Sequence, residues 1–263
     1  MISIQNLSAG YGKLEVLHDL RLTMAGQRMT AILGPNGSGK STLLKAVFGL
    51  ARVFRGSIQV EGQELVGLPT EVIGQRGIAY VPQRENLFTT LTVRENLLLA
   101  ARQLDKAAAQ RALDEAYDLF PTLAKRQTQR AGQLSGGERQ MVAIAIGWLS
   151  RPSAMLLDEP SAGLSPLMAK EVFRALSELR TQGITLVVVE QNARSLLQWC
   201  DDVVVLREGQ LAFQGTVEQC RADEELLKNL LGVRAVKEKG STVSVVQTPP
   251  PTPPRIQGGE KDE

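Results

Sequence analysis

The sequence is poor in the residues that build disulfide frameworks and histidine-rich metal sites. It contains one histidine and two cysteines in 263 residues. Cys200 and Cys220 are too few for a disulfide framework, and no histidine accompanies them at metal-ligand spacing. So few cysteines are typical of proteins in a reducing compartment, so a cytoplasmic setting is predicted.

Long apolar runs and a strong net charge are also missing. The longest apolar run, 141–149, is far shorter than the roughly 18 residues that can cross a bilayer. Residues 1–6 lack the basic and apolar pattern of an export signal, so no exported form is expected. A formal net charge of +2 argues against a dominant nucleic-acid-binding surface. A protein of this kind would work at a membrane only through a partner.

What the sequence does contain is an alternation of strand and helix patterns. Strands are predicted at 2–7, 16–24, 28–33, 56–60, 77–81, 154–157, 185–189 and 203–206. A helix is predicted at 41–50, and a turn at 9–13 separates the first two strands. A helical insert, about 85–150, interrupts the alternation; it opens with the capping-box pattern of Thr92 and Glu95, and its first helical stretch ends near Pro121. The pattern predicts an α/β fold with a parallel-sheet core and a helical subdomain.

The C-terminal end has a different composition. The predicted folded domain covers 1–235, and 236–263 is rich in proline and poor in large apolar residues. Such a segment buries too little surface to offset its chain entropy, so a disordered tail is expected. A proline-rich ligand for a partner domain is the alternative.

The strongest motif follows the predicted strand at 28–33. It has the spacing Gly-x-x-x-x-Gly-Lys-Ser and comprises Gly34, Pro35, Asn36, Gly37, Ser38, Gly39, Lys40, Ser41 and Thr42. Glycines let backbone N–H groups wrap a phosphate, and the following helix directs its positive dipole end at the same place. Lys40 would supply charge to the β- and γ-phosphates, and Ser41 a hydroxyl to Mg²⁺. The motif predicts a P-loop nucleotide site rather than an ordinary glycine turn.

A pair of carboxylates would complete this site. The apolar stretch 154–157 leads into Asp158 and Glu159. Asp158 would emerge at the carboxyl end of a buried strand and hold Mg²⁺, while Glu159 would polarise an attacking water. The alternative is that both carboxylates only cap the next helix.

A third motif distinguishes between families. Residues 134–140, Leu-Ser-Gly-Gly-Glu-Arg-Gln, precede a long predicted helix and provide a second helix start that suits an anion. A phosphate-loop kinase would explain Lys40 and Asp158 but not this segment. The chain would then have two phosphate-binding half-sites, the glycine loop and this helix start, but only one of them has a lysine. This makes sense if two chains meet and each completes the other's site. Taken alone, the segment could also be an ordinary N-cap.

Together these motifs resemble the ATP-binding subunits of ABC transporters over about residues 2–232. The resemblance implies a P-loop NTPase core of the ABC ATPase type, with an antiparallel β subdomain and a helical subdomain. It makes 34–42 the Walker A loop, 154–158 the Walker B strand and Glu159 the catalytic carboxylate. Lys40 would act in catalysis with it.

The resemblance also assigns the remaining binding residues. Tyr11 would stack on adenine, although a tyrosine beside a turn is often only a surface residue. Gln83 would reach the metal together with Ser41 and Asp158. The signature segment would contact the ATP of the partner protomer through Ser135, Gly136, Gly137 and Glu138.

Two positions depart from the common pattern of the family. The segment 162–165 ends in Ser165 where aspartate is usual, and Gln191 stands where most members have histidine. Glutamine cannot carry a proton but can hydrogen-bond a γ-phosphate oxygen or the attacking water. We therefore expect Glu159 and Gln191 to position the water. The single histidine, His18, lies elsewhere and is interpreted as structural.

These departures narrow the resemblance to the LivF-type ATPases of branched-chain amino acid importers, which also include ATPases for urea and amide uptake. The resemblance implies ATP and Mg²⁺ as ligands, and a second ATP-binding subunit, either the same chain or a LivG-like sister. It further implies membrane permease subunits, a periplasmic or extracellular solute-binding protein, no nucleic acid, and a peripheral place on the cytoplasmic face of the cell membrane.

The permease would contact residues near 83–96, where Leu87, Phe88 and Leu91 either receive it or pack the helical lobe. A soluble ABC ATPase acting on nucleic acid or the ribosome is the alternative.

Overall fold

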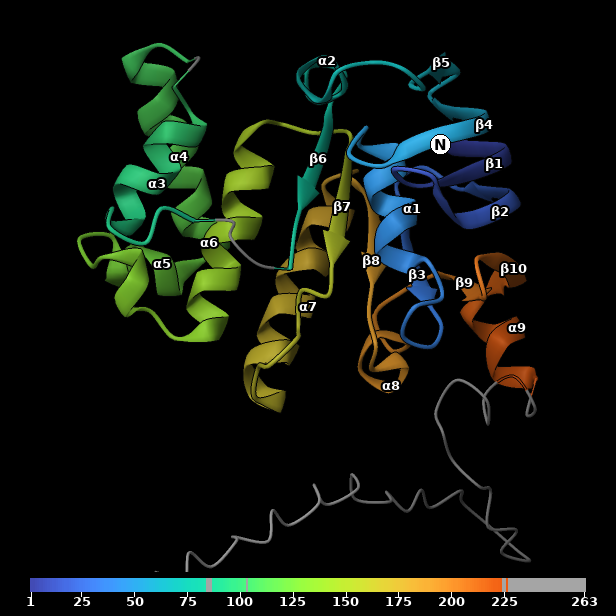
Figure 1. Ribbon diagram of the computed structural model, residues 1–263. Helices are drawn as coiled ribbons and strands as arrows, with labels where there is room; N and C mark the ends of the chain where they lie inside the picture. The colour runs from blue at the N-terminus through green and yellow to red at the C-terminus, as the bar shows by residue number, and fades with distance from the viewer. Residues whose placement is uncertain (84–86, 103, 224–225, 227–263) are drawn as a thin grey trace, which may run out of the picture.

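Two β-sheets form the framework of the computed structural model, which describes residues 1–83, 87–102, 104–223 and 226 (Figure 1). The antiparallel sheet has the order β2-β1-β4-β5. Its strands are β1 (Ile2–Tyr11), β2 (Leu14–Met24), β4 (Arg52–Val60) and β5 (Gln63–Glu64). The second sheet has the order β10-β9-β3-β8-β7-β6. Its strands are β3 (Met29–Leu33), β6 (Ile78–Val81), β7 (Ala154–Asp158), β8 (Thr185–Val189), β9 (Asp202–Arg207) and β10 (Gln210–Thr216).

The second sheet is parallel except for β10 and is buried on both faces. Alternate residues of β3 show this: Met29 and Ala31 belong to one hydrophobic cluster, and Ile32 belongs to the other. Because both faces are covered, its central strands are almost continuously apolar, as the sequence indicated. The structure thus has the fold class expected of a P-loop NTPase.

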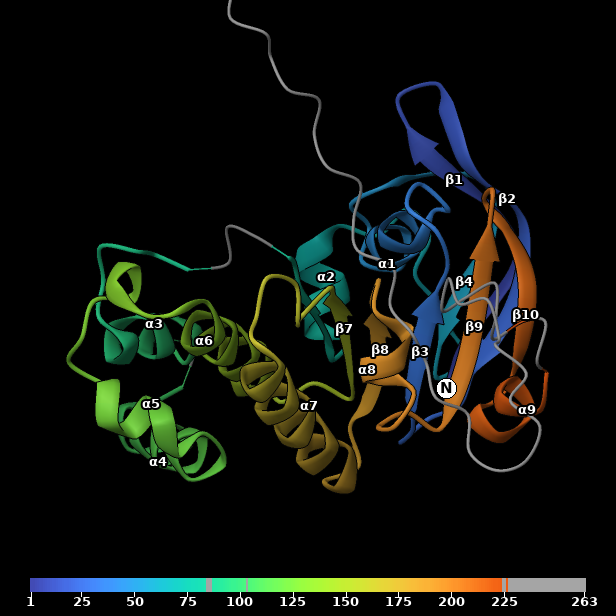
Figure 2. The same cartoon turned by 90° about the horizontal axis from the view of Figure 1, so that it is seen from below.

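Helices lie on opposite faces of this sheet. The helix α1 (Lys40–Val47) packs between the two sheets, and α7 (Pro166–Thr181) packs on the other face (Figures 1 and 2). The chain leaves β3 toward one face and β7 toward the other, both at the carboxyl edge of the sheet. Ligands of open α/β sheets bind outside such a crevice. Three short helices complete the core: α2 (Thr70–Gln75), α8 (Ala193–Leu196) and α9 (Val217–Ala222).

A helical lobe lies to one side of α7 (Figure 1). It comprises α3 (Val93–Ala100), α4 (Lys106–Leu119), α5 (Pro121–Arg126), the 3₁₀ turn η1 (Ala131–Gln133) and α6 (Gly136–Leu149). The capping box of Thr92 and Glu95 forms at the start of α3, as predicted. The first helical stretch is divided, because the Asp105 side chain accepts the N–H of Ala108 and starts a separate helix. Helical structure also continues past Pro121, which occupies the first turn of α5.

Other predicted boundaries change modestly. The first two strands reach Tyr11 and Leu14, so the turn between them is only Gly12-Lys13. The helix predicted at 41–50 begins at Lys40 and ends at Val47, because Gly49 adopts a left-handed φ of 75°. The strands β5 and β10 were not predicted. The predicted C-terminal tail lies outside the described residues, and within them no helix is both long and apolar enough to cross a membrane.

Candidate nucleotide-binding site

The phosphate loop, residues 34–42, joins β3 to α1. Gly34 has a φ of 146°, and a Cβ atom there would lie 2.2 Å from the carbonyl oxygen of Leu206, so only glycine fits. The buried hydroxyl of Ser38 has no hydrogen-bond partner among the described residues. An unpaired hydroxyl in a glycine-lined cradle at a helix N-terminus fits a phosphate ligand.

Lys40 is folded back onto this loop. Its side chain is 5% exposed, and Nζ donates hydrogen bonds to the carbonyl oxygens of Gly34 at 2.9 Å and Pro35 at 3.0 Å. Two of its three donors are thus used inside the loop. Burial lowers the pKa of Lys40, and the nearby charges of Glu159 and Asp158 oppose that shift. The Lys40 ammonium is therefore held against the phosphate loop, near the carboxylates of Glu159 and Asp158.

Asp158 ends β7 beside the phosphate loop. The Ser41 hydroxyl donates to its Oδ1 at 2.8 Å, and the Tyr80 hydroxyl donates to its Oδ2 at 3.3 Å. Burial, followed by the charge of Asp158, raises the pKa of Tyr80, which keeps this phenol a donor. A hydroxyl and a carboxylate in contact are hard oxygen ligands of the kind that Mg²⁺ prefers, so these residues fit that ion. Sequence reasoning missed Tyr80, whose only signal was its place three residues before Gln83.

Glu159 is held by two amide side chains. Gln83 Nε2 donates to Glu159 Oε2 at 2.6 Å, and Gln191 Nε2 donates to Oε1 at 2.9 Å and Oε2 at 3.0 Å. The backbone of Glu159 has a φ of 48°, an unusual conformation for a non-glycine residue. Its N–H donates to the Val189 oxygen at 2.9 Å. The structure thereby brings together Gln83, Glu159 and Gln191, which are far apart in the sequence.

The phosphate loop and Glu159 share a cavity of about 240 Å³. It is lined by Val16, Asn36, Gly37, Gly39, Lys40, Ser41, Thr42 and Glu159. Val16, from β2, was not predicted. Tyr11 is not among these lining residues; it is 42% exposed, and its ring centroid lies 5.9 Å from Lys45 Nζ on α1. The cavity therefore unites the lysine, the hydroxyl and the carboxylate that the sequence singled out.

The signature segment lies elsewhere, at the start of α6. Ser135 is the N-cap, and its hydroxyl and the Glu138 carboxylate form a reciprocal capping box. Glu138 Oε1 also accepts the Nε–H of Arg126 at 3.0 Å. Burial would raise the pKa of Glu138, but the hydrogen bonds from Ser135 and Arg126 outweigh it, so the pKa is lowered. In both views β7 separates α6 from α1, so the segment does not join the phosphate loop of its own chain (Figures 1 and 2).

The segment 87–92 leads from the core to the helical lobe, and a single buried side chain organises it. Asn96 Oδ1 accepts the Phe88 N–H at 2.9 Å, and its Nδ2 donates to the oxygens of Phe88 and Thr92. Phe88 is 63% exposed, whereas Leu87 packs against the core. The predicted permease-contact segment also includes 84–86, which lie outside the described residues.

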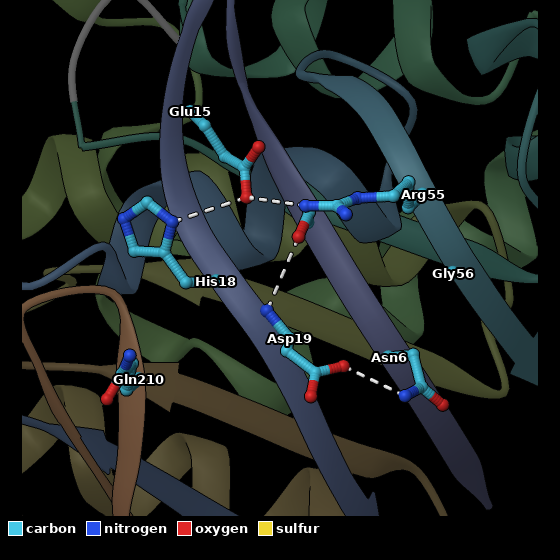
Figure 3. Close-up of a pocket in the computed structure, with 8 residues that line it drawn as sticks. Asn6, Glu15, His18, Asp19, Arg55, Gly56 and Gln210 are labelled. Carbon is cyan, nitrogen blue, oxygen red and sulfur yellow. Dashed lines mark hydrogen bonds and ion pairs between the residues drawn. The ribbon is translucent and has the colours of Figure 1, made fainter.

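His18 lies in a separate cavity of about 700 Å³ on the antiparallel sheet (Figure 3). Its ring contacts Glu15, which also pairs with Arg55, and Asn6 donates to Asp19 (Figure 3). Glu15 thus contacts both His18 and Arg55 inside the cavity, whereas Asp19 pairs with Arg21, which does not line it. None of them lines the cavity that contains the phosphate loop.

Comparison with known proteins gives consistent results. The ABC transporter family profile matches residues 17–162. The high-affinity branched-chain amino acid transport ATP-binding protein BraG of Pseudomonas aeruginosa is 42% identical over 216 residues, covering 82% of this chain and 93% of that protein. The probable branched-chain amino acid transport ATP-binding protein LivF of Archaeoglobus fulgidus is 41% identical over 234 residues, covering 89% and 99%.

More distant relatives extend the comparison. The lipopolysaccharide export system ATP-binding protein LptB of Haemophilus influenzae is 32% identical over 234 residues, covering 88% of this chain and 97% of that protein. A nucleotide-free ATP-binding cassette from an ABC transporter superposes with a TM-score of 0.78 at 23% identity, covering 87% of this chain and 98% of that chain. That structure shows the shared fold. The family match, these relatives and the phosphate-loop geometry together establish that the chain belongs to the ABC transporter family, as an ATP-binding subunit that hydrolyses ATP.

Proposed function

We propose that this ATPase energises uptake of branched-chain or other hydrophobic amino acids, or of urea and related amides, through separate membrane permease subunits. The proposal rests on one observation: β7 separates the phosphate loop from the signature segment of the same chain, so one chain alone does not bring the two together. A phosphate loop on one side and a signature helix start on the other suit two chains that each complete the other's site. The partner is a second copy or a LivG-like sister subunit.

Each ATP would lie between the phosphate loop of one chain and residues 135–138 of the other. Lys40 would meet the β- and γ-phosphates, Ser135 and the N-terminus of α6 would meet the same phosphates from the partner, and Tyr11 would stack on adenine. Ser41, Asp158 and Gln83 would hold Mg²⁺, which when bound neutralises phosphate charge.

Hydrolysis requires an oriented water and a carboxylate acceptor for its proton. Glu159 would accept that proton, and the amides of Gln83 and Gln191 would hold its carboxylate toward the cavity. Gln191 cannot itself carry a proton, so orientation is its role in this proposal.

Closure of the two chains would move the helical lobes and pull on the permease. Phe88 is the exposed apolar residue of the segment that Asn96 organises, so it would receive a short permease helix. The chain would thus lie on the cytoplasmic face of the membrane through its partners, and a solute-binding protein would deliver the substrate on the opposite face.

The direction of transport is proposed from the relatives. Two relatives at 41% and 42% identity are described as branched-chain amino acid transport proteins, and one at 32% is described as a lipopolysaccharide export protein. The higher identity favours uptake of amino acids over export of lipid.

The test removes this chain from its own cells and measures uptake of labelled leucine, valine and urea. Restoring the parent chain is expected to restore uptake of at least one of these solutes, and restoring Lys40→Ala is not. Normal uptake of all three solutes in the absence of the chain, together with loss of surface lipopolysaccharide, would assign it to export instead. Tagged chain purified from detergent-solubilised membranes should bring a polytopic membrane protein with it.

A further inference from the structure

A buried carboxylate beside the hydrolytic residues has no role in the mechanism above. Glu190 follows β8 directly, and its side chain is only 3% exposed. A buried carboxylate must be compensated by hydrogen bonds or charge, so its partners indicate what it does. In the chain Glu190 immediately precedes Gln191, and in space it contacts the segment that follows Glu159.

The contacts of Glu190 join these two segments. Its Oε1 accepts the backbone N–H of Ser161 at 2.8 Å, and the Ser161 hydroxyl and the Gln191 N–H also act on the carboxylate. Burial raises the pKa of Glu190, the hydrogen bonds from Ser161 oppose this shift, and the negative charge of Glu159 adds to it. The side chain therefore holds the backbone of Ser161 directly, and Glu190 itself adjoins Gln191 in the chain.

The backbone between these contacts is strained. Glu159 has a left-handed φ of 48°, and such conformations persist only where the surroundings fix them. The N–H of Glu159 is fixed by the Val189 oxygen, and the N–H of Ser161, two residues later, is fixed by Glu190. Consecutive residues at the end of β8 thus determine the path of 159–161.

A cavity of about 410 Å³ opens at the same place. It is lined by Gln83, Glu159, Ser161, Ala162, Gly163, Leu164, Pro166, Ala169, Glu190, Gln191, Asn192 and Ser195. These residues come from three separate segments of the chain. Among the carboxylates that line it, Glu190 is the one that is nearly fully buried, and it bonds to Ser161 in another of these segments.

We propose that Glu190 is a positioning residue for ATP hydrolysis: it ties Ser161 to Gln191 and so holds the Glu159 carboxylate where the Gln191 amide can orient it. The inference rests on the ATPase activity of the chain and on the proposed roles of Glu159 and Gln191. It assigns no contact between Glu190 and the nucleotide.

The experiment measures kcat, KM and the affinity for a fluorescent ATP analogue on the full-length chain. Glu190→Ala is expected to lower kcat about tenfold, the loss of one hydrogen bond to a charged group, and to leave nucleotide affinity within about twofold. Glu190→Gln keeps an oxygen that can accept the Ser161 N–H, so it is expected to retain at least about a third of the parent kcat. Thr185→Val is the matched control, because Thr185 is a buried polar residue at the other end of β8 that accepts the N–H of Gln27.

A double variant separates positioning from general destabilisation. If Glu190 acts through the Gln191 contact, Glu190→Ala combined with Gln191→Ala will lose clearly less activity than the product of the two single losses. Full multiplication of the losses would overturn the inference, as would a Glu190→Ala kcat equal to that of Thr185→Val. An equal defect in Glu190→Gln would also overturn it, since charge rather than the hydrogen bond would then matter.

Where Glu190→Ala fails to fold, Glu190→Asp is the variant to measure. It withdraws the carboxylate by one methylene, so a reduced kcat with unchanged nucleotide affinity supports the inference and a parent-like kcat overturns it. If the parent chain itself hydrolyses no ATP, the ATPase assignment fails. If the parent hydrolyses ATP but the Glu190 variants behave otherwise than expected, only the Glu190 inference fails.

Discussion

Replacing Gln191 by alanine tests whether an amide can serve at the position where the resemblance implies histidine in most members of the family. The side chain donates to both oxygens of Glu159, at 2.9 and 3.0 Å, through a single nitrogen. Gln83 donates to the same carboxylate at 2.6 Å and remains in the variant. Gln191→Ala therefore removes one of two donors that orient the carboxylate.

The size of the effect follows from this geometry. A hydrogen bond to a charged group contributes about 1.5–3 kcal/mol, and the lower figure applies because Gln191 is exposed and water can replace it. About 1.4 kcal/mol corresponds to a tenfold change in rate. We therefore expect kcat to fall about tenfold. KM should change little, because Gln191 is not among the residues that line the phosphate-loop cavity.

The assay is steady-state release of phosphate by the full-length chain at saturating Mg·ATP. Gln198→Ala is the matched control, since Gln198 is an exposed glutamine close by whose amide donates to the Ser195 oxygen. Its kcat should equal that of the parent, and the unfolding temperatures of both variants should remain near the parent value. Undiminished hydrolysis by Gln191→Ala would refute the reasoning and leave Glu159 to act with Gln83 alone.

Three further predictions concern the signature helix, pH and the metal. A Cβ at Gly137 would lie 2.5 Å from Met168 Cε, which can move away, but also 3.1 Å from Met168 Cβ, which cannot, so Gly137→Ala should lower the free energy of unfolding by about 1 kcal/mol. Gly136→Ala, whose nearest neighbour would be 3.3 Å away, should cost clearly less in the same denaturant titration. The pKa of Glu138 is lowered on folding, so its stabilisation is present above the ordinary value of 4.5 and is lost as pH falls through the lower folded value. Glu138→Gln should therefore flatten the stability profile in that acidic window, and an unchanged profile would contradict the assignment. Chelation by EDTA should abolish hydrolysis and added Mg²⁺ should restore it, with Asp158→Ala restored far less at the same Mg²⁺ concentration.

Local sequence patterns were sufficient where one segment determines its own conformation. The phosphate loop is such a case, since glycine spacing, a buried strand and a helix start are all local features. The capping box at Thr92, which was predicted, is also local, because it links residues three apart; the one at Ser135 is of the same kind but was not predicted. The apolar runs of β3, β7 and β8 likewise indicated strands buried on both faces.

Contacts between distant segments could be obtained only from the tertiary structure. No local pattern indicated that Tyr80 would donate to Asp158, or that Val16 would line the cavity. These contacts depend on the order of strands in the sheets, which places β6 beside β7 and folds β2 over the phosphate loop. Glu190 is the clearest example, because in sequence it is one acidic residue after an apolar strand.

The sequence by itself thus determined the fold class and the ATP-binding class of the protein, and it predicted Lys40, Asp158 and Glu159 as site residues, because a glycine-rich loop before a helix and a carboxylate at the end of a buried strand are local patterns. Tertiary structure alone decided that both amides converge on one carboxylate, that Glu190 is buried with its carboxylate on the Ser161 N–H, and that β7 separates the signature helix from the phosphate loop. The physical reason is that burial and hydrogen bonding depend on which strands become neighbours, and residues far apart in the chain determine that order.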